Sequence, residues 1–339
     1  MIIVVKPGAT KEQVREILDQ LEQHGLTAHI SEGAERTIIG VIGDKSRLST
    51  DSLEVLPAVE KLVPIMESYK LASKAFRPEG MSFAIKDVTI GGRELTMMAG
   101  PCSVESEEQV ETVAQAVRAC GAKILRGGAY KPRTSPYAFQ GLEREGLKIL
   151  RRVADRNGLL VISEITSEND IAFASEYVDM IQIGARNAQN FRLLSAVGKS
   201  GIPVLLKRGI AETIDEWLGS AEYIMSEGNY KIALCERGIR TFETATRSTL
   251  DVSAVPVLKD KTHLPVIVDP SHAAGKARYV PSLSRAAIAA GADGLIIEVH
   301  PNPKCALSDA AQQLTPDDYK NLTNEIRAMS TILGRVYPE

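Results

Sequence analysis

Short apolar runs recur along residues 93–339 and alternate with segments of helical period. Eight of the runs are continuously apolar, which is typical of strands buried on both faces of a parallel sheet. They are Thr96–Ala99, Lys123–Leu125, Leu159–Ser163, Met180–Ile183, Val204–Leu206, Lys231–Leu234, Val266–Val268 and Leu295–Ile297. Helical patterns cover Glu107–Ala119, Leu142–Arg156, Asn169–Tyr177, Asn190–Val197, Ile214–Ser226 and Leu283–Ala290, with a weaker one at Phe242–Leu250 and a last one near Pro316–Leu333. Eight strand–helix units predict an α/β fold of the (β/α)8 TIM barrel type.

A doubly wound open sheet is the alternative architecture for this alternation. It is disfavoured because no Gly-x-Gly-x-x-Gly motif opens the first helix. Before the first strand, Phe83–Ile90 and Arg93–Leu95 flank Gly91-Gly92. This pattern predicts a hairpin that caps the floor of the barrel.

Residues 1–70 show a different order of elements. Strands are expected at Ile2–Lys6, Leu26–Ser31, Thr37–Ile42 and Val59–Met66, and helices from the cap Thr10 to Gly25 and over Leu48–Leu56. This is the order of a ferredoxin-like α+β domain. We therefore expect such a domain at 1–70, a linker with the hairpin at 71–92 and the barrel at 93–339. Because 1–70 hold no cluster of catalytic residue types, we expect a regulatory role, with a purely structural or oligomerising role as the alternative.

The composition excludes several classes of protein. Of the 339 residues, 44% are hydrophobic and 24% charged, which are the values of a globular chain. No apolar run reaches the roughly 18 residues of a membrane helix, and the first residues do not resemble a signal peptide. The net charge of −3 gives no reason to expect nucleic acid. The four cysteines lack C-x-x-C spacing, so we expect reduced thiols and a cytoplasmic protein.

Cations follow several of the predicted strands. The carboxyl ends of barrel strands meet on one face, where barrel enzymes carry their active sites. Like charges gathered in one cleft repel each other unless an anion is bound there, and arginine fits phosphate and carboxylate groups bidentately. Six cations at one face therefore indicate a ligand with more than one anionic group. They are Arg126, Lys131, Arg133, Arg186, Lys207 and Arg237.

A second set of residues has the chemistry of a metal site. Cys102 follows the first strand, His272 the seventh and Glu298 the eighth, and Asp309 lies in the loop beyond. Closure of the barrel makes strands one and eight neighbours, as are seven and eight, so these side chains meet. A thiolate, an imidazole and two carboxylates suit Mn, Fe, Co or Zn better than Ca or Mg. The alternative is that Cys102 is a buried small apolar residue. His300 shares a strand face with Glu298 and is a candidate for supporting this set.

Five of these segments together strongly resemble the 3-deoxy-D-arabino-heptulosonate 7-phosphate (DAHP) synthases. They are Ala99–Ser103, Leu125–Pro136, Gln182–Asn187, Leu206–Gly209 and Asp269–His272. The similarity extends over the whole chain, and residues 1–70 resemble the subgroup with a ferredoxin-like regulatory domain. The resemblance implies condensation of phosphoenolpyruvate with erythrose 4-phosphate, the first step of the shikimate pathway. One stretch departs from the pattern, because relatives often carry Arg-Asp near the end of Ser271–Ala277.

The resemblance also implies roles for individual residues. One divalent metal ion would be held by Cys102, His272, Glu298 and Asp309. Phosphoenolpyruvate would be bound by Arg126, Lys131, Ala185, Arg186, Lys207 and Arg237, and the aldose phosphate by Lys131, Pro132, Arg133, Thr134 and Ser135. We expect Lys131, Glu164, Lys207 and His272 to act in catalysis, with Glu164 deprotonating or orienting the attacking water. An ion-pair partner for the cations is the alternative role of Glu164.

Regulation by an end product is expected from the N-terminal domain. We expect tyrosine or phenylalanine as effector, and a site that includes His29, Ser31 and Gly33 in the segment 29–35. A backbone turn there can present N–H groups to a carboxylate. A homotetramer is the expected assembly, with neither nucleic acid nor membrane as a partner.

Two other functions remain open from the sequence. A sister family makes an eight-carbon analogue from arabinose 5-phosphate and carries Lys-Ala-Asn-Arg-Ser where this chain has Lys-Pro-Arg-Thr-Ser at 131–135. Its metal-free members have Asn at the position of Cys102. The third possibility is a non-catalytic sensor of phosphorylated sugars or amino acids, which would be expected to lack a metal ligand or a cation.

Overall fold

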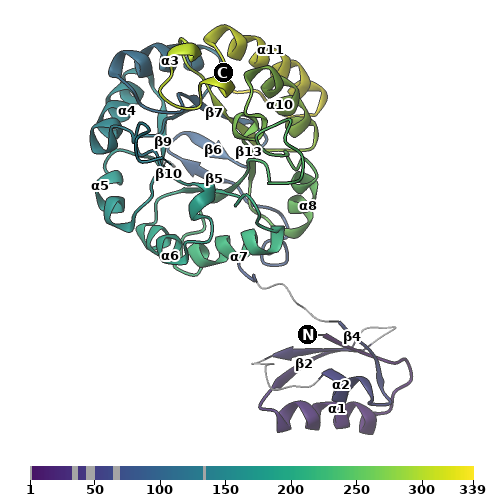
Figure 1. Ribbon diagram of the computed structural model, residues 1–339. Coiled ribbons are helices and arrows are strands. Elements are labelled where there is room, and N and C mark those ends of the chain that lie inside the picture. The colour runs from purple at the N-terminus through teal and green to yellow at the C-terminus, as the bar shows by residue number, and fades with distance from the viewer. Residues whose placement is uncertain (1, 33–36, 43–49, 64–68, 133–134) are drawn as a thin grey trace. The chain divides into compact units, whose positions relative to one another are not determined.

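The structure is a computed structural model that describes residues 2–32, 37–42, 50–63, 69–132 and 135–339. The chain divides into two compact units, Met1–Ser68 and Tyr69–Glu339 (Figure 1). Within the described ranges, no helix is long and apolar enough to cross a membrane.

The N-terminal unit is a four-stranded antiparallel sheet with two helices. Its elements are β1 (Ile2–Val5), α1 (Lys11–Gln23), β2 (Thr27–Glu32), β3 (Thr37–Ile42), α2 (Thr50–Glu54) and β4 (Val59–Val63). The strand order β2-β3-β1-β4 is that of the ferredoxin-like fold. Helix α1 begins where expected, because Thr10 and Gln13 form a reciprocal capping box. Ile17 and Leu21 bury its apolar face against Ile3 and Ile39.

The second unit is a closed barrel of eight parallel strands. The strands are β7 (Thr96–Gly100), β8 (Ile124–Arg126), β9 (Leu160–Glu164), β10 (Met180–Ile183), β11 (Val204–Lys207), β12 (Ile232–Glu236), β13 (Val266–Val268) and β14 (Gly294–Glu298). Pairing of β14 with β7, with Glu298 opposite Gly100, closes the ring. Nearly every strand residue is buried, as the continuous apolar runs predict. The predicted (β/α)8 fold is confirmed.

Helices cover the outside of the barrel (Figure 1). They are α3 (Glu107–Ala119), α4 (Glu143–Asn157), α5 (Ile171–Ala174), α6 (Phe191–Ser200), α7 (Ile214–Met225), α8 (Ala254–Lys261), α9 (Pro270–Ala274), α10 (Val280–Ala289) and α11 (Pro316–Ile332). Short 3-10 turns add η2 (Glu168–Asp170), η3 (Ala185–Asn187), η4 (Ala277–Tyr279), η5 (Pro303–Cys305) and η6 (Ala310–Gln312). Trp217 of α7 is fully buried, and its Nε1 donates to the carbonyl oxygen of Leu206 at 3.3 Å.

The helix expected at Phe242–Leu250 does not form. Hydroxyl groups in this segment bond locally instead, as between Thr241 Oγ1 and Thr249 Oγ1 at 2.7 Å and from Thr246 Oγ1 to the Ser248 carbonyl at 3.0 Å. Such bonds compete with helical backbone bonds. The crossover helix between β12 and β13 is α8, a segment for which the apolar spacing did not predict a helix.

The floor hairpin also differs in its pairing. It joins β5 (Phe83–Ile85) to β6 (Val88–Ile90), so its turn lies at Lys86-Asp87 rather than at Gly91-Gly92. Lys86 supplies the left-handed turn conformation, with φ of 52°. The hairpin packs on inward-facing apolar residues of the strands, including Met98 and Ile124, and it lies within the ring of strands in Figure 1. The lower part of the barrel is therefore filled, and the polar chemistry collects at the carboxyl ends of the strands.

Candidate active site

The carboxyl ends of the strands surround a polar cavity of about 400 Å³. Gly128 follows β8, Gly184 follows β10 and His272 follows β13, so the cavity is assembled from segments far apart in the sequence. The charged residues that line it are Arg126, Lys131, Glu164, Arg186, Lys207, Arg237, Arg240, Arg247, His272 and Asp309. This set holds seven arginines and lysines and only two carboxylates, so the cavity is strongly cationic.

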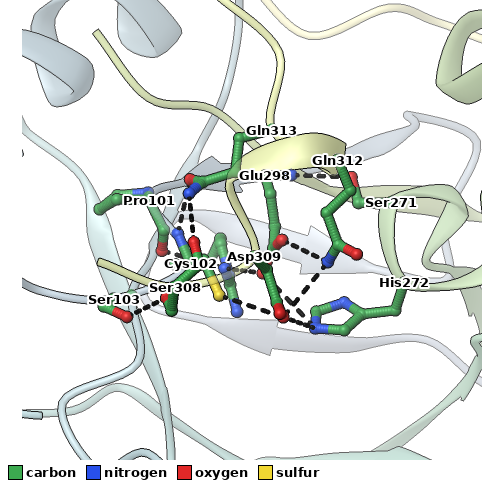
Figure 2. Close-up of polar contacts among 12 residues, drawn as sticks. Pro101, Cys102, Ser103, Ser271, His272, Glu298, Ser308, Asp309, Gln312 and Gln313 are labelled. Carbon is green, nitrogen blue, oxygen red and sulfur yellow. Dashed lines mark hydrogen bonds and ion pairs between the residues drawn. The ribbon is translucent and has the colours of Figure 1, made fainter. Parts of the chain in front are cut away.

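Beside the cavity, a thiol, an imidazole and two carboxylates converge (Figure 2). One ligand atom each of Cys102, Glu298 and Asp309 lies within 4.8 Å of the others. Cys102 Sγ is 3.6 Å from Asp309 Oδ2. Nε2 of His272 is 3.5 Å from Glu298 Oε1 and 3.9 Å from Asp309 Oδ2. We call these four residues the Cys102 cluster.

Asp269 sets the orientation of the His272 ring. Its Oδ1 accepts from the His272 backbone N–H at 2.9 Å, which caps the short helix α9, and its Oδ2 lies 2.7 Å from His272 Nδ1. The same Oδ2 accepts from Lys207 Nζ. A carboxylate on Nδ1 places the proton there and leaves Nε2 as a lone-pair donor toward the cluster, which is the usual arrangement for a metal-binding histidine.

Arg247 and Gln312 orient the two carboxylates of the cluster. Arg247 Nη1 lies 3.1 Å from Asp309 Oδ2 and also donates to Gln312 Oε1 at 2.9 Å. Gln312 in turn donates to Glu298 Oε2 at 2.6 Å. Glu298 also accepts from Arg126 at 2.7 Å through Oε1. Both carboxylates of the cluster are thus oriented by neighbouring cations and by one amide.

Burial and charge set the protonation of the cluster. Burial raises the pKa of the Cys102 thiol to about 11, and Glu298 adds to this, whereas Lys131 at 3.0 Å from the sulfur opposes it. Burial also lowers the pKa of His272, which keeps the ring neutral. For Asp309, burial favours the neutral acid, but the charge of Arg247, aided by Lys131, outweighs it and holds the pKa of Asp309 below the usual range.

This donor set fits a transition metal. The buried thiol needs a strong local positive charge to ionise, the imidazole is neutral, and both carboxylates are ionised. One sulfur, one nitrogen and carboxylate oxygens are ligands for a borderline divalent ion.

Several cations in the cavity lack a carboxylate partner. Lys207 pairs with Asp269, Arg126 with Glu298 and Arg247 with Asp309. By contrast, Lys131, Arg186, Arg237 and Arg240 form no ion pair with any residue that the structure describes. Arg237 is 6% exposed, and its hydrogen-bond partners among the described residues are neutral acceptors, the Ser248 hydroxyl and the carbonyls of Gly238 and His272. Burial lowers its pKa. Such an arrangement is suited to an anionic ligand.

Glu164 faces the same cavity from the end of β9. Its described hydrogen-bond partner is a neutral amide, because Gln182 Nε2 donates to Glu164 Oε2 at 3.2 Å across the β9–β10 pair. No ion pair joins Glu164 to a described cation. The carboxylate occupies the space left by Gly184, where a Cβ would lie 2.0 Å from Oε1. These contacts favour a carboxylate available for chemistry over an ion-pair partner.

The other expected site residues are distributed as follows. Pro132 and Ala185 line the cavity, whereas Ser135 is exposed and is not among the lining residues. Arg133 and Thr134 lie outside the described residues, as does Gly33. His29 and Ser31 belong to strand β2, which extends to Glu32, so they do not lie in the turn expected within the segment 29–35. Cys235 is buried in the barrel, and Cys305 is exposed.

Two cavity cations, Arg240 and Arg247, were not predicted. They lie in the irregular segment after β12, eleven residues or fewer beyond its end, where no periodic signal distinguishes a site residue from a surface one. Arg237 and Arg240 lie at the start of the β12–α8 loop, and Arg247 lies in the later part, which was expected to be helical.

Comparison with protein families covers both units. Residues 68–334 match the DAHP synthetase I family, and residues 1–67 match the DAHP synthase ferredoxin-like domain. The chain belongs to the DAHP synthetase I family. It is therefore an enzyme, and its family catalyses the first step of the shikimate pathway.

Relatives of known sequence and structure agree with the family match. A phospho-2-dehydro-3-deoxyheptonate aldolase of Thermotoga maritima is 53% identical over 98% of this chain and 99% of its own. The crystal structure of a DAHP synthase from Thermotoga maritima superimposes with a TM-score of 0.82 at 52% identity, covering 99% of this chain and 98% of that one. A 2-dehydro-3-deoxyphosphooctonate aldolase of Syntrophotalea carbinolica is 32% identical over 74% of this chain and 96% of its own.

Proposed function

We propose that this DAHP synthase condenses phosphoenolpyruvate with erythrose 4-phosphate and water, releasing inorganic phosphate, by a metal-dependent reaction. The main support for this proposal is that the cavity contains cations without carboxylate partners and that these cations lie next to the Cys102 cluster. The higher identity to the heptulosonate relative, and the additional N-terminal match, support erythrose 4-phosphate over arabinose 5-phosphate.

Phosphoenolpyruvate has the charges that this cavity would neutralise. Its phosphate and carboxylate are assigned to Arg126, Lys131, Ala185, Arg186, Lys207 and Arg237. The aldose phosphate is assigned to Lys131, Pro132, Arg133, Thr134 and Ser135. Arg237 and Arg186 are the strongest candidates for the phosphate that leaves, since their charges are not compensated within the described chain. Fixed cations of this kind stabilise charge without reorganising during the reaction.

The metal ion would be held by Cys102, His272, Glu298 and Asp309. When bound, it would act as a Lewis acid that polarises the aldehyde oxygen. The donor set is compatible with Mn, Fe, Co or Zn.

The bonds that form and break in the reaction indicate what the remaining residues would do. Carbon 3 of phosphoenolpyruvate bonds to the aldehyde carbon, water adds to carbon 2, and the bond from carbon 2 to the phosphate oxygen breaks. Glu164 would accept a proton from that water, and Gln182 leaves one of its oxygens free of a described partner. Lys131 and Lys207 would stabilise the oxygen atoms that gain negative charge, and His272 would help to hold the metal ion.

Phosphate release is the direct test of this function. The full-length protein, stripped with a chelator and reloaded with Mn²⁺, should release phosphate only when both phosphoenolpyruvate and erythrose 4-phosphate are present. Arabinose 5-phosphate should be a poor replacement. Cys102→Ala should lose bound metal and turnover together, and full activity of metal-free Cys102→Ala would exclude the metal assignment. A folded, metal-loaded protein that releases no phosphate would favour the non-catalytic sensor.

We also propose that residues 1–70 regulate the barrel in response to tyrosine or phenylalanine. The match to the ferredoxin-like domain of the family supports this role, as does the complete set of candidate site residues within the barrel. A solved truncated DAHP synthase from Thermotoga maritima, 50% identical, covers 79% of this chain with a TM-score of 0.75, so a related barrel folds alone. Deleting residues 1–68, which keeps the buried Tyr69 of the barrel core, should leave an active barrel that neither amino acid inhibits. If the truncated protein were inhibited as strongly as the intact protein, which we expect to be a homotetramer, the domain would have a structural role instead.

A further inference from the structure

Asp309 lies in a segment with little regular structure. Between β14 and α11, the only described helical turns are η5 and η6, and Asp309 directly precedes η6. Its φ is 45°, in the left-handed region that side chains other than glycine rarely adopt. Such a conformation persists only when surrounding contacts enforce it. The backbone at Asp309 must therefore be held in place by contacts of the surrounding chain.

Glu105 and His300 provide one set of such contacts. His300 is 4% exposed, and its Nδ1 accepts from the Asn302 backbone N–H at 3.0 Å. Its proton is therefore on Nε2, which donates to Glu105 Oε2 at 3.3 Å. The other Glu105 oxygen accepts from the Leu307 backbone N–H at 2.9 Å. One carboxylate thus ties together both ends of the segment 300–307 that precedes Asp309.

Glu105 itself is anchored close to Cys102. It lies three residues beyond Cys102, and its backbone N–H donates to Gln109 Oε1 at 3.2 Å. Gln109 of α3 donates to the Ser103 carbonyl at 3.1 Å. The loop after β7 is therefore rigidly joined to α3, and Glu105 projects from it toward the segment that carries Asp309.

Further contacts connect the same two segments. Oγ of Ser103 contacts Oγ of Ser308, and Gln313 accepts from the Cys102 backbone N–H at 3.0 Å while donating to the Ser308 carbonyl at 2.9 Å. Figure 2 shows Ser103 and Ser308 on the side of Cys102 away from His272, and Gln313 above Cys102. Within the described chain, neither Glu105 nor His300 forms a hydrogen bond or ion pair with a member of the Cys102 cluster.

We propose that Glu105 and His300 are positioning residues that preset the metal site. By joining the loop after β7 to the segment after β14, they fix the Cys102 thiol and the Asp309 carboxylate at binding distance before the ion arrives. This inference rests on the metal dependence proposed above. Residues hydrogen-bonded directly to metal ligands typically contribute about 10- to 100-fold to metal affinity. Glu105 and His300 act one contact further from the ion, so we expect the lower end of this range, about 10-fold.

Cobalt binding tests the proposal independently of turnover. Chelator-stripped, full-length protein is titrated with Co²⁺ against a competing chelator, and the thiolate-to-cobalt charge-transfer absorption reports the bond to Cys102. Glu105→Ala should bind Co²⁺ about 10-fold more weakly, the lower end of the range for groups that contact metal ligands directly. Glu105→Gln keeps an acceptor oxygen of the same reach and should lose less. Glu108→Ala, an exposed glutamate in the same chain segment, is the matched control and should bind like the parent.

A double substitution tests whether the two residues act together. Because each holds the other, Glu105→Ala combined with His300→Ala should weaken Co²⁺ binding no further than the stronger single substitution. Folded Glu105→Ala and Glu105→Gln proteins with the affinity and absorption of the parent would overturn the inference, whatever their thermal stability. Absence of a Cys102-dependent absorption in the parent protein would instead reject the metal site itself.

Discussion

Placing a methyl group at Gly184 should displace Glu164 while leaving the backbone unstrained. Gly184 has φ of −73°, which alanine adopts freely. The new Cβ would lie 2.0 Å from Glu164 Oε1 and 2.5 Å from its Cδ. The obstructing atoms are the end of a flexible side chain, so we expect the carboxylate to move and the fold to survive.

The size of the effect can be worked out from this distance. Ordinary contact begins near 3.4 Å, so Oε1 must move by about 1.4 Å, and the bond from Gln182 at 3.2 Å is lost. A misplacement of about 1 Å can cost on the order of 100-fold in rate. We therefore expect Gly184→Ala to lower kcat by about 100-fold, equivalent to about 2.7 kcal/mol in the activation barrier.

Steady-state phosphate release, with thermal unfolding as the check on folding, measures this prediction. Gly219→Ala in α7 is the matched control, because a Cβ there meets nothing within 4 Å and should leave kcat unchanged. The loss should also depend on Glu164, so Gly184→Ala should cost little in a Glu164→Ala background. An unchanged kcat in the single variant, or an equal loss in both backgrounds, would refute the assignment of the water-activating role to Glu164.

Three further predictions concern other parts of the barrel. Arg133→Ala should raise KM for erythrose 4-phosphate roughly 10- to 100-fold, because one charged hydrogen bond to the substrate is lost. An equal rise in KM for phosphoenolpyruvate would contradict this division of roles. Arg237→Ala should show the reverse selectivity in the same kinetic assay, because its uncompensated charge is assigned to phosphoenolpyruvate. Asp179→Asn should lower the free energy of unfolding by about 1.5–3 kcal/mol at neutral pH, since Asp179 bonds Lys86 and Arg151, each at 2.7 Å. Burial raises the pKa of Asp179, but these cations outweigh burial and hold it below 3.8. Urea titrations should therefore show that the difference in unfolding free energy between parent and variant shrinks as pH falls below 3.8. A difference that stays constant with pH would exclude an ionic origin.

The sequence predicts the barrel well because each strand is buried on both faces. Runs such as Met180–Ile183 and Val266–Val268 coincide with the observed strands. A closed parallel barrel brings the carboxyl ends of all its strands to a single face. The proximity of Cys102 and Glu298 could therefore be predicted from strand order alone.

The parts that could not be predicted depend on loops. Arg247 and Gln312 meet across irregular segments, at 2.9 Å, and no period in the sequence relates them. The link between Glu105 and His300 likewise joins positions separated by 195 residues. In the segment 242–250, the competition between hydroxyl and backbone hydrogen bonds decides against a helix, and this depends on side-chain geometry rather than on apolar spacing.

Closure of the barrel by β14 against β7 has a consequence for biosynthesis. Three of the four residues in the Cys102 cluster follow residue 270, and Glu298 meets Gly100 only when the last strand has been made. A ribosome adding about 5–20 residues per second needs roughly 10–40 s to pass from Cys102 to Glu298. During that interval Cys102 is a free thiol on an incomplete barrel. Interrupted translation products would therefore lack three of the four residues proposed to hold the metal ion, so the proposed site would be complete only in a chain whose barrel has closed.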